Sequence, residues 1–139
     1  MKVAQYFIVT AKYLKEHPNT IFVYSGNYSH YLPLYFSREV INQLHPFMVQ
    51  VLPSTSLNRD GKFFTPRAYL KYIYPIEEQL LVQKIEENPD KEFLIDPIGY
   101  FMYRNPWDVF SSIINDKLRD KVRKFNNVTL LWGGINRRK

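Results

Sequence analysis

The segment Thr20-Ile21-Phe22-Val23-Tyr24-Ser25-Gly26-Asn27 decides the fold. The four residues from Ile21 to Tyr24 favour extended structure and carry no charge, and the turn formers Ser25 to Asn27 end the run. A short apolar run bounded by turn formers is typical of a strand buried on both faces. Such a strand belongs inside a sheet covered by helices, and the loop at its carboxyl end is where open α/β sheets place ligands.

Strand-like and helix-like segments alternate along the whole chain. We expect strands at Val3–Val9, Ile21–Tyr24, Phe47–Leu52, Glu92–Ile95 and Val128–Trp132. Helices are expected at Thr10–Glu16, after Ser37 up to His45-Pro46, from Thr65-Pro66 to Glu87 with an interruption at Pro75, and from Asn105-Pro106 to Val122. This order predicts an α/β fold with a mostly parallel sheet flanked by helices. We expect a single domain over residues 1–134 and a basic tail over residues 135–139.

The apolar side chains predict which helix faces are buried. In the helix after Pro75 the predicted buried side carries Ile76, Leu80, Leu81 and Ile85. In the last helix, apolar residues recur at intervals of three and four, at Trp107, Phe110, Ile113, Ile114, Leu118 and Val122. The chain also has 11 tyrosines, and we expect many to be half-buried with the hydroxyl in water.

The composition excludes several classes of protein. With 139 residues, 45% of them apolar, the chain can bury a core and is not disordered. It has no cysteine, which excludes disulfides, thiolate metal sites and a cysteine nucleophile. No run of 18 apolar residues occurs, and the N-terminal apolar run is too short for a signal peptide. We therefore expect a cytoplasmic protein with no membrane partner.

The first candidate ligand site is the loop after the predicted strand Ile21–Tyr24. It comprises Ser25, Gly26, Asn27 and Tyr28, together with His30. Gly26 can adopt a positive φ, and His30 can titrate near neutral pH. Such a loop can bind a phosphate or a ribose through backbone amides. The alternative interpretation is an ordinary turn between a strand and a helix, with His30 on the surface.

The same region resembles a known sequence signature. The run from His17 to Asn27, His-Pro-Asn-Thr-Ile-Phe-Val-Tyr-Ser-Gly-Asn, is similar to one in small uncharacterised proteins of phages and bacteria. In that family His-Pro-Asp-Thr-Ile-Phe-Val-Phe precedes Gly-Asp-Asn and a glycine-rich loop, whereas Ser25-Gly26 replaces Gly-Asp here and no glycine-rich stretch follows. The resemblance implies an α/β domain and a phage origin, with the host cytoplasm as the location. It implies no reaction.

The second candidate site is the turn Asp96-Pro97-Ile98-Gly99-Tyr100. If the strand Glu92–Ile95 lies next to the strand Ile21–Tyr24 in the sheet, then Asp96, Gly99 and Tyr100 lie beside the first loop. Asp96 can then bind a ribose hydroxyl or hold a proton. The alternative is that Asp96 only initiates a turn. A third cluster, Ser54-Thr55-Ser56, offers three hydroxyls to an anion but is also common loop chemistry. The chain has neither a P-loop nor GxGxxG.

Catalytic motifs are missing from the sequence. The three histidines, His17, His30 and His45, lie far apart and form no HExxH or other metal-binding pattern. No Gly-x-Ser-x-Gly elbow occurs. We therefore expect no metal, no cofactor and no catalytic residue, and a protein that is not an enzyme.

All of the net charge lies at the C-terminal end. From Asn115 to Lys139 there are eight basic and two acidic residues, which accounts for the net charge of +6. The candidate residues for binding a macromolecule are Lys117, Lys121, Lys124, Arg137, Arg138 and Lys139. The alternative is a solvated helix face whose cations interact with the negative end of the helix dipole.

Two functions follow from these patterns. The first is a non-enzymatic binding protein, such as a phage accessory factor that engages a host protein or a nucleic acid through its basic end. The alternative is a domain that binds a small nucleotide-like ligand through the loops after Tyr24 and Ile95.

Overall fold

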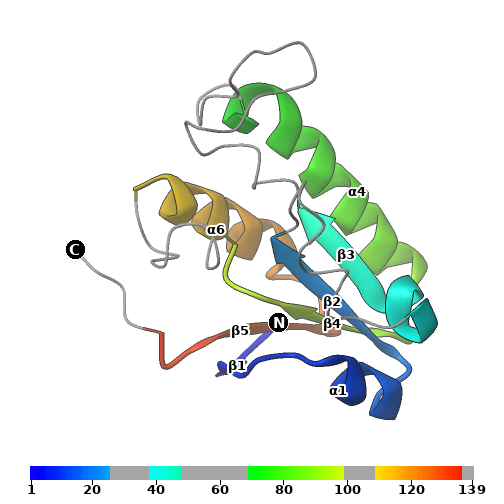
Figure 1. Ribbon diagram of the computed structural model, residues 1–139. Helices are drawn as coiled ribbons and strands as arrows, with labels where there is room; N and C mark the ends of the chain where they lie inside the picture. The colour runs from blue at the N-terminus through cyan, green and yellow to red at the C-terminus, as the bar shows by residue number, and fades with distance from the viewer. Residues whose placement is uncertain (26–37, 48–68, 99–108, 136–139) are drawn as a thin grey trace, which may run out of the picture.

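The computed structural model describes residues 1–25, 38–47, 69–98 and 109–135 (Figure 1). These residues contain one sheet of five strands, all paired in parallel, in the order β1-β5-β4-β2-β3. The strands are β1 (Lys2–Gln5), β2 (Thr20–Ser25), β3 (Leu44–Phe47), β4 (Glu92–Ile95) and β5 (Val128–Gly133). The predicted α/β fold with a parallel sheet flanked by helices is confirmed.

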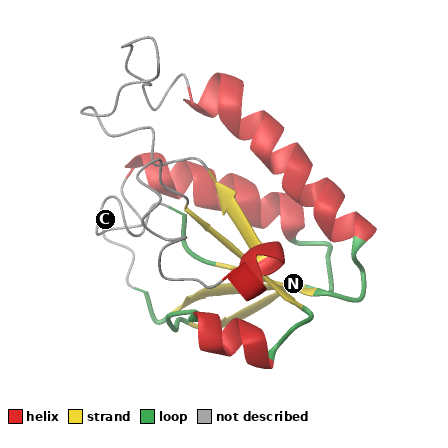
Figure 2. Cartoon of the chain, turned by 45° about the vertical axis from the view of Figure 1, so that its right-hand side comes forward, coloured by secondary structure: helices red, strands yellow, loops and turns green. Residues whose placement is uncertain are grey.

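Helical segments cover the sheet on both sides. Figure 2 shows the short helix α1 (Ala11–Glu16) on one side and the two long helices α4 (Tyr74–Glu87) and α6 (Val109–Val122) on the other. The 3-10 helix η1 (Arg38–Gln43) packs on the same side as α1, and the π-helix η3 (Tyr69–Ile73) leads into α4. This split follows from right-handed crossovers, because connections that move along the sheet in opposite directions lie on opposite faces.

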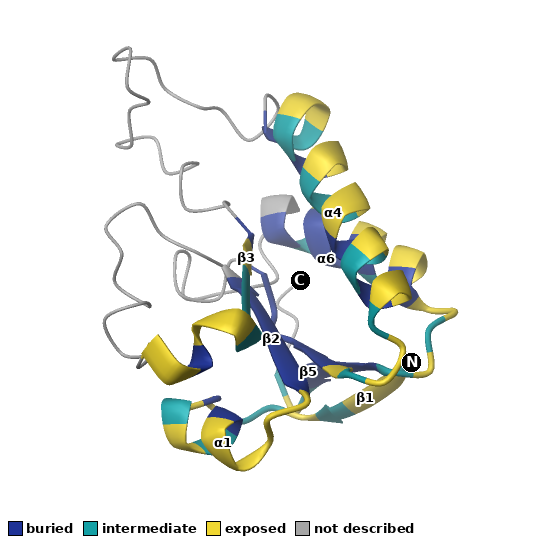
Figure 3. Cartoon of the chain, turned by 90° about the vertical axis from the view of Figure 1, so that its right-hand side faces the viewer, coloured by how far each residue is buried: buried dark blue, intermediate teal, exposed yellow. Residues whose placement is uncertain are grey.

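Strand β2 is buried on both faces, as its sequence predicts. Ile21 and Val23 join the core under α4 and α6, whereas Phe22 and Tyr24 join the core beside α1 and η1. Its neighbours in the sheet are β4 and β3, so β2 is an interior strand, and β4 occupies the middle position. Strands β2, β4 and β5 form the buried centre of the molecule, whereas the edge strand β1 is mostly exposed (Figure 3).

Strand β1 is shorter than the predicted Val3–Val9. It ends at Gln5, where its register with β5 shifts, although the amide of Tyr6 still donates to the carbonyl of Gly133 at 2.8 Å. A Cβ atom at Gly133 would lie 2.8 Å from the carbonyl oxygen of Ala4, so the two backbones approach this closely only because Gly133 has no side chain. Helix α1 begins as expected, because the Thr10 hydroxyl accepts from the amide of Tyr13 at 3.1 Å.

The predicted helix after Ser37 is largely replaced by other structure. Residues 38–43 form the 3-10 helix η1, and β3 begins already at Leu44 and includes His45 and Pro46. A proline fits here because β3 is an edge strand, where one side of the backbone has no strand partner. The rest of the predicted strand Phe47–Leu52 lies outside the described residues.

The prediction of the buried face of α4 is correct for two of its four residues and wrong for the other two. Leu81 and Ile85 are buried together with Tyr74, but Ile76 and Leu80 are exposed. The helix carries two apolar stripes, and only one of them faces the sheet. In α6 the prediction holds for Ile114, Leu118 and Val122, which are buried, whereas Ile113 is partly exposed and the predicted start at Asn105 lies outside the described residues.

Candidate functional site

The two candidate ligand loops leave from neighbouring strands. Val23 of β2 pairs with Ile95 of β4, and the amide of Asp96 donates to the carbonyl of Val23 at 2.9 Å. Ser25, which ends β2, therefore lies at the same edge of the sheet as Asp96. The remaining residues of the candidate site lie outside the described residues; they are Gly26, Asn27, Tyr28, His30, Gly99 and Tyr100.

This edge is a topological switch point. After β2 the chain passes through η1 on one face of the sheet, and after β4 it passes through α6 on the opposite face. Two adjacent strands whose connections separate in this way leave a crevice at their carboxyl ends, which is where open α/β sheets bind ligands. The strand order, which the sequence left open, thus places both candidate loops at the edge that this rule selects.

Asp96 is an unusual residue at this edge. Its relative exposure is only 3%, and within the described part of the chain its carboxyl group forms no hydrogen bond or ion pair. Burial raises the pKa of Asp96 from 3.8 to about 8. The carboxyl group is therefore mostly protonated at neutral pH and can donate one hydrogen bond and accept others. A buried, strongly perturbed carboxyl at such an edge is typical of functional sites.

A buried amide holds the turn that follows Asp96. The amide of Ile98 donates to Asn115 Oδ1 at 2.9 Å, and Asn115 Nδ2 donates to the carbonyl of Ile98 at 3.1 Å. Asn115 comes from α6 and is fully buried. Because both polar groups of one residue are bound by one side chain, the turn after β4 has a defined position relative to α6.

The sequence analysis missed Asn115, although its spacing carries a signal. Ser111, Asn115, Leu118 and Val122 follow one another at intervals of four, three and four, so they share a helix face, and all four are buried. Two polar residues in a buried stripe indicate hydrogen-bonding partners in the core. Both lie in the half of α6 nearest the carboxyl edge, because α6 begins after β4.

Aromatic residues pack beside the end of β3. The ring of Tyr74 lies 6.4 Å from that of Phe47 and 6.3 Å from that of Tyr69. The hydroxyl of Tyr69 donates to the carboxylate of Glu77, and burial, followed by this acidic neighbour, raises the pKa of Tyr69 far above its usual value. Tyr69, Tyr74 and Tyr24 are all buried, so the expectation of half-buried tyrosines is wrong for these three. Phe47, Tyr69 and Tyr74 are therefore part of the hydrophobic core beside the end of β3.

Two of the three histidines, His17 and His45, lie in the described part of the chain and pack against neighbouring residues. His17 stacks on Tyr13 with the ring centres 4.0 Å apart, and its Nδ1 lies 2.7 Å from the Tyr13 carbonyl oxygen. His45 lies in β3, where burial and then the nearby Lys84 lower its pKa to about 4. His30 and the cluster Ser54 to Ser56 lie outside the described residues. Among the described residues, no group of histidine, aspartate and glutamate side chains could hold a metal ion.

The basic residues of α6 are interspersed with acids. Lys121 Nζ lies 3.8 Å from Glu78 Oε1 of α4, and Arg119 and Arg123 contact Asp120 at 3.8 and 2.9 Å. Lys117 is exposed on α6, whereas Lys124 lies in the turn after it, with its Nζ 5.2 Å from the centre of the Phe125 ring. Arg137, Arg138 and Lys139 lie outside the described residues.

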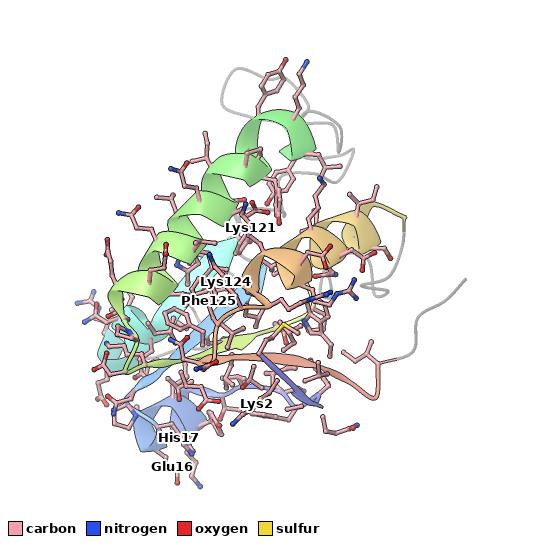
Figure 4. All side chains as sticks on the ribbon, turned by 180° about the vertical axis from the view of Figure 1, so that it is seen from behind. Lys2, Glu16, His17, Lys121, Lys124 and Phe125 are labelled. Carbon is pink, nitrogen blue, oxygen red and sulfur yellow. The ribbon has the colours of Figure 1, made fainter. Side chains whose placement is uncertain are left out.

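Lys121 and Lys124 lie toward the opposite edge of the sheet from the candidate ligand site. Helix α6 runs from the carboxyl edge, after β4, to the amino edge, before β5, so Lys121 and Lys124 lie near the amino edge. Figure 4 shows both lysines on the side of α4 and α6, away from His17 and Glu16 beside α1. Strand β5 then returns the chain to the carboxyl edge, where the described residues end at Ile135.

Comparison of the chain with family models, with curated proteins and with solved structures finds no match. The similarity at residues 17–27 therefore stays an interpretation of the sequence. No helix in the described part of the chain is long and apolar enough to cross a bilayer.

Proposed function

We propose that the protein binds a small nucleotide-like molecule at the carboxyl edge of the sheet, where β2 and β4 end side by side. The observation that carries this proposal is Asp96, a buried carboxyl group without a hydrogen bond in the described residues, at the switch point of a parallel sheet. A buried polar group without a partner costs free energy, and a ligand that hydrogen-bonds to it removes this cost.

The chemistry of Asp96 favours a neutral polar group on the ligand. A protonated carboxyl group both donates and accepts, which matches a ribose hydroxyl or an amide better than a bare anion. Asn115 supports this role because it holds Ile98, two residues after Asp96, in a defined position. Backbone amides of the loop after β2 would supply contacts to a phosphate.

The test is a panel of nucleosides and nucleotides at millimolar concentration, with the melting temperature and calorimetric binding as readouts. A ligand that binds the folded state raises the melting temperature. We expect Asp96→Ala and Asn27→Ala each to lower the affinity for that ligand at least about tenfold, which corresponds to ~1.4 kcal/mol of binding free energy. The matched control is Asp90→Asn, which changes an exposed carboxylate at the other edge of the sheet and leaves binding unchanged.

Two results would contradict this proposal. One is that no nucleoside or nucleotide of the panel raises the melting temperature at any concentration tested. The other is a ligand whose affinity is the same in the wild type and in Asp96→Ala, because the ligand then binds elsewhere on the protein.

Binding of a host protein or a nucleic acid, as a phage accessory factor would do, is a second proposal. It is supported by the location of all the net charge after residue 114, and by Lys117 and Lys124, which have no carboxylate partner in the described residues. The ion pairs of Arg119, Lys121 and Arg123 reduce the charge available to a polyanion.

Charge reversal tests this second proposal. The amount of host protein or nucleic acid that the protein captures from a lysate, with and without nuclease, is the measurement. It should fall in a variant with Lys117, Lys124, Arg137 and Arg138 all changed to Glu. The matched control reverses Lys2 and Lys12, which are exposed in β1 and α1. Equal capture by the two variants would contradict the proposal.

A further inference from the structure

The side chain of Asp96 lies on the face of the sheet that α1 covers. Phe93 and Ile95 of β4 belong to the core under α4 and α6, whereas Leu94 belongs to the core beside α1. The amide of Asp96 donates to the carbonyl of Val23, so Asp96 continues the pairing of β4 with β2 by one residue. Because successive side chains of a strand point to opposite faces, Asp96 shares the face of Leu94.

Apolar side chains flank Asp96 on this face. The registers of β4 with β2 and with β5 place Tyr24 on one side of Asp96 and Leu131 on the other. Both flanking residues are buried, and the ring of Tyr24 stacks on that of Phe22 with the ring centres 5.3 Å apart. The Asp96 carboxyl group therefore has apolar neighbours on both adjacent strands, and such surroundings disfavour its ionised form.

The ionisable groups in the described part of this face leave Asp96 neutral. Burial raises the pKa of the Tyr24 hydroxyl, so that group stays uncharged. Glu92 is exposed at the amino edge of the same strand, and Lys15 and Glu39 pair with each other at 3.4 Å. The other ionisable side chains of residues 1–17 and of η1 are at least partly exposed, and they are Lys2, Tyr6, Lys12, Tyr13, Glu16, His17 and Arg38. Burial is thus what raises the pKa of Asp96 to about 8.

A neutral carboxyl group selects its hydrogen-bond partner. It offers one donor and one acceptor side by side. The hydrogen-bonding edge of a nucleobase carries the complementary pair, an accepting ring nitrogen or carbonyl next to a donating N–H. A ribose instead presents neighbouring hydroxyl donors, which an ionised carboxylate binds best. Its remaining hydroxyls would also lose water beside Tyr24 and Leu131 without gaining a partner there.

We propose that Asp96 binds the base of the ligand rather than its sugar, and that the protonated carboxyl group pairs with one donor and one acceptor on the edge of the base. Ionisation of Asp96 removes the donor and breaks this pair. The inference rests on the proposed function, because it assigns which part of a nucleotide-like ligand Asp96 recognises. An asparagine at this position would offer the same two groups without an ionisable proton.

Free bases separate recognition of the base from recognition of the sugar. Adenine, uracil and hypoxanthine, their nucleosides and nucleotides, and ribose phosphate are titrated into the full chain by calorimetry. We expect at least one base to bind without its sugar, and its analogue with the donor N–H methylated to bind at least about tenfold more weakly. Ribose phosphate should also bind at least about tenfold more weakly than the matching nucleotide.

The outcomes distinguish this inference from the proposed function. Ribose phosphate that binds as tightly as the nucleotide, or a methylated base that binds as tightly as the parent base, would overturn the inference and leave the proposed function standing. If no base, nucleoside or nucleotide binds, both are wrong.

Substitution of Asp96 tests its protonated form. At pH 7 Asp96→Asn should bind the ligand at least about tenfold more tightly than Asp96→Ala, because the amide replaces both hydrogen bonds. The affinity of the wild type should fall about tenfold from pH 7 to pH 9, since only the protonated carboxyl group binds and it ionises near pH 8. In Asp96→Asn the affinity should change only as far as the ligand itself titrates.

Asp90→Asn is the matched control, because it removes an exposed carboxylate and should keep the wild-type pH dependence. The inference is overturned if Asp96→Asn binds as weakly as Asp96→Ala, since an ionised carboxylate then holds the ligand. It is equally overturned if the wild type and Asp96→Asn show the same change in affinity between pH 7 and pH 9.

Discussion

The two edges of the sheet use polar side chains in different ways. At the amino edge, side-chain amides bind the carbonyl groups of the turns. Asn127 Nδ2 donates to the carbonyls of Asn88 and Lys91 at 3.2 and 2.9 Å. Gln43 Nε2 lies 2.9 to 3.0 Å from three carbonyl oxygens, those of Leu14, His17 and Thr20. These groups are neutral at every pH, and they tie the turns to the core.

The carboxyl edge contains one similar amide and one very different group. Asn115 binds the turn after β4 just as Asn127 binds the turn before it. Asp96, in contrast, is ionisable, buried and without a hydrogen bond in the described residues. The amino edge therefore uses neutral amides, whereas the carboxyl edge holds an ionisable group, which is the group on which the proposed ligand site depends.

The largest expected effect concerns the pH dependence of Asp96. The folded protein holds its proton up to a pH of about 8, whereas the unfolded chain releases it near 3.8. The free energy of unfolding therefore falls as the pH rises through this range. In Asp96→Asn this loss is absent, so the stability of the variant relative to the wild type grows by up to about 5 kcal/mol between pH 4 and pH 9.

Urea unfolding at several pH values measures this effect. Asp90→Asn, at the amino edge, is the control and should follow the wild-type curve. Parallel curves for the wild type and Asp96→Asn would mean that the Asp96 carboxyl is hydrated in solution. The proposed contrast between the two edges would then be wrong.

The next effect concerns the amide at the carboxyl edge. Asn115→Leu keeps the size of the side chain but leaves both backbone groups of Ile98 without a partner. We expect a loss of about 3 kcal/mol in the free energy of unfolding, together with faster hydrogen exchange at the Ile98 amide. A change below about 0.5 kcal/mol would show that the turn holds its position without Asn115.

The smallest effect is expected at the amino edge. Asn127→Ala removes two hydrogen bonds to turn carbonyls that are only partly buried, so water replaces them at low cost. We expect a loss of about 1 kcal/mol and no change in ligand affinity. The neighbouring exposed residue Asn126 provides the control, as Asn126→Ala should change neither quantity. A change in ligand affinity in Asn127→Ala would remove the distinction between the edges.

Local patterns in the sequence were sufficient for the fold class. The uncharged run at Ile21–Tyr24, the cap at Thr10 and the strands at Glu92 and Val128 were predicted correctly. Each of these features depends on interactions between residues close together in the chain, or on burial of a whole segment, so composition and spacing report them directly.

Other features depend on contacts between distant segments. Only the strand order places β2 beside β4, and hence Tyr24 and Asp96 at one edge. The sequence of α4 has two apolar stripes, and packing on the sheet selects Leu81 and Ile85 over Ile76 and Leu80. Periodicity finds apolar faces but cannot rank them, because burial is decided by what the rest of the chain places against each face.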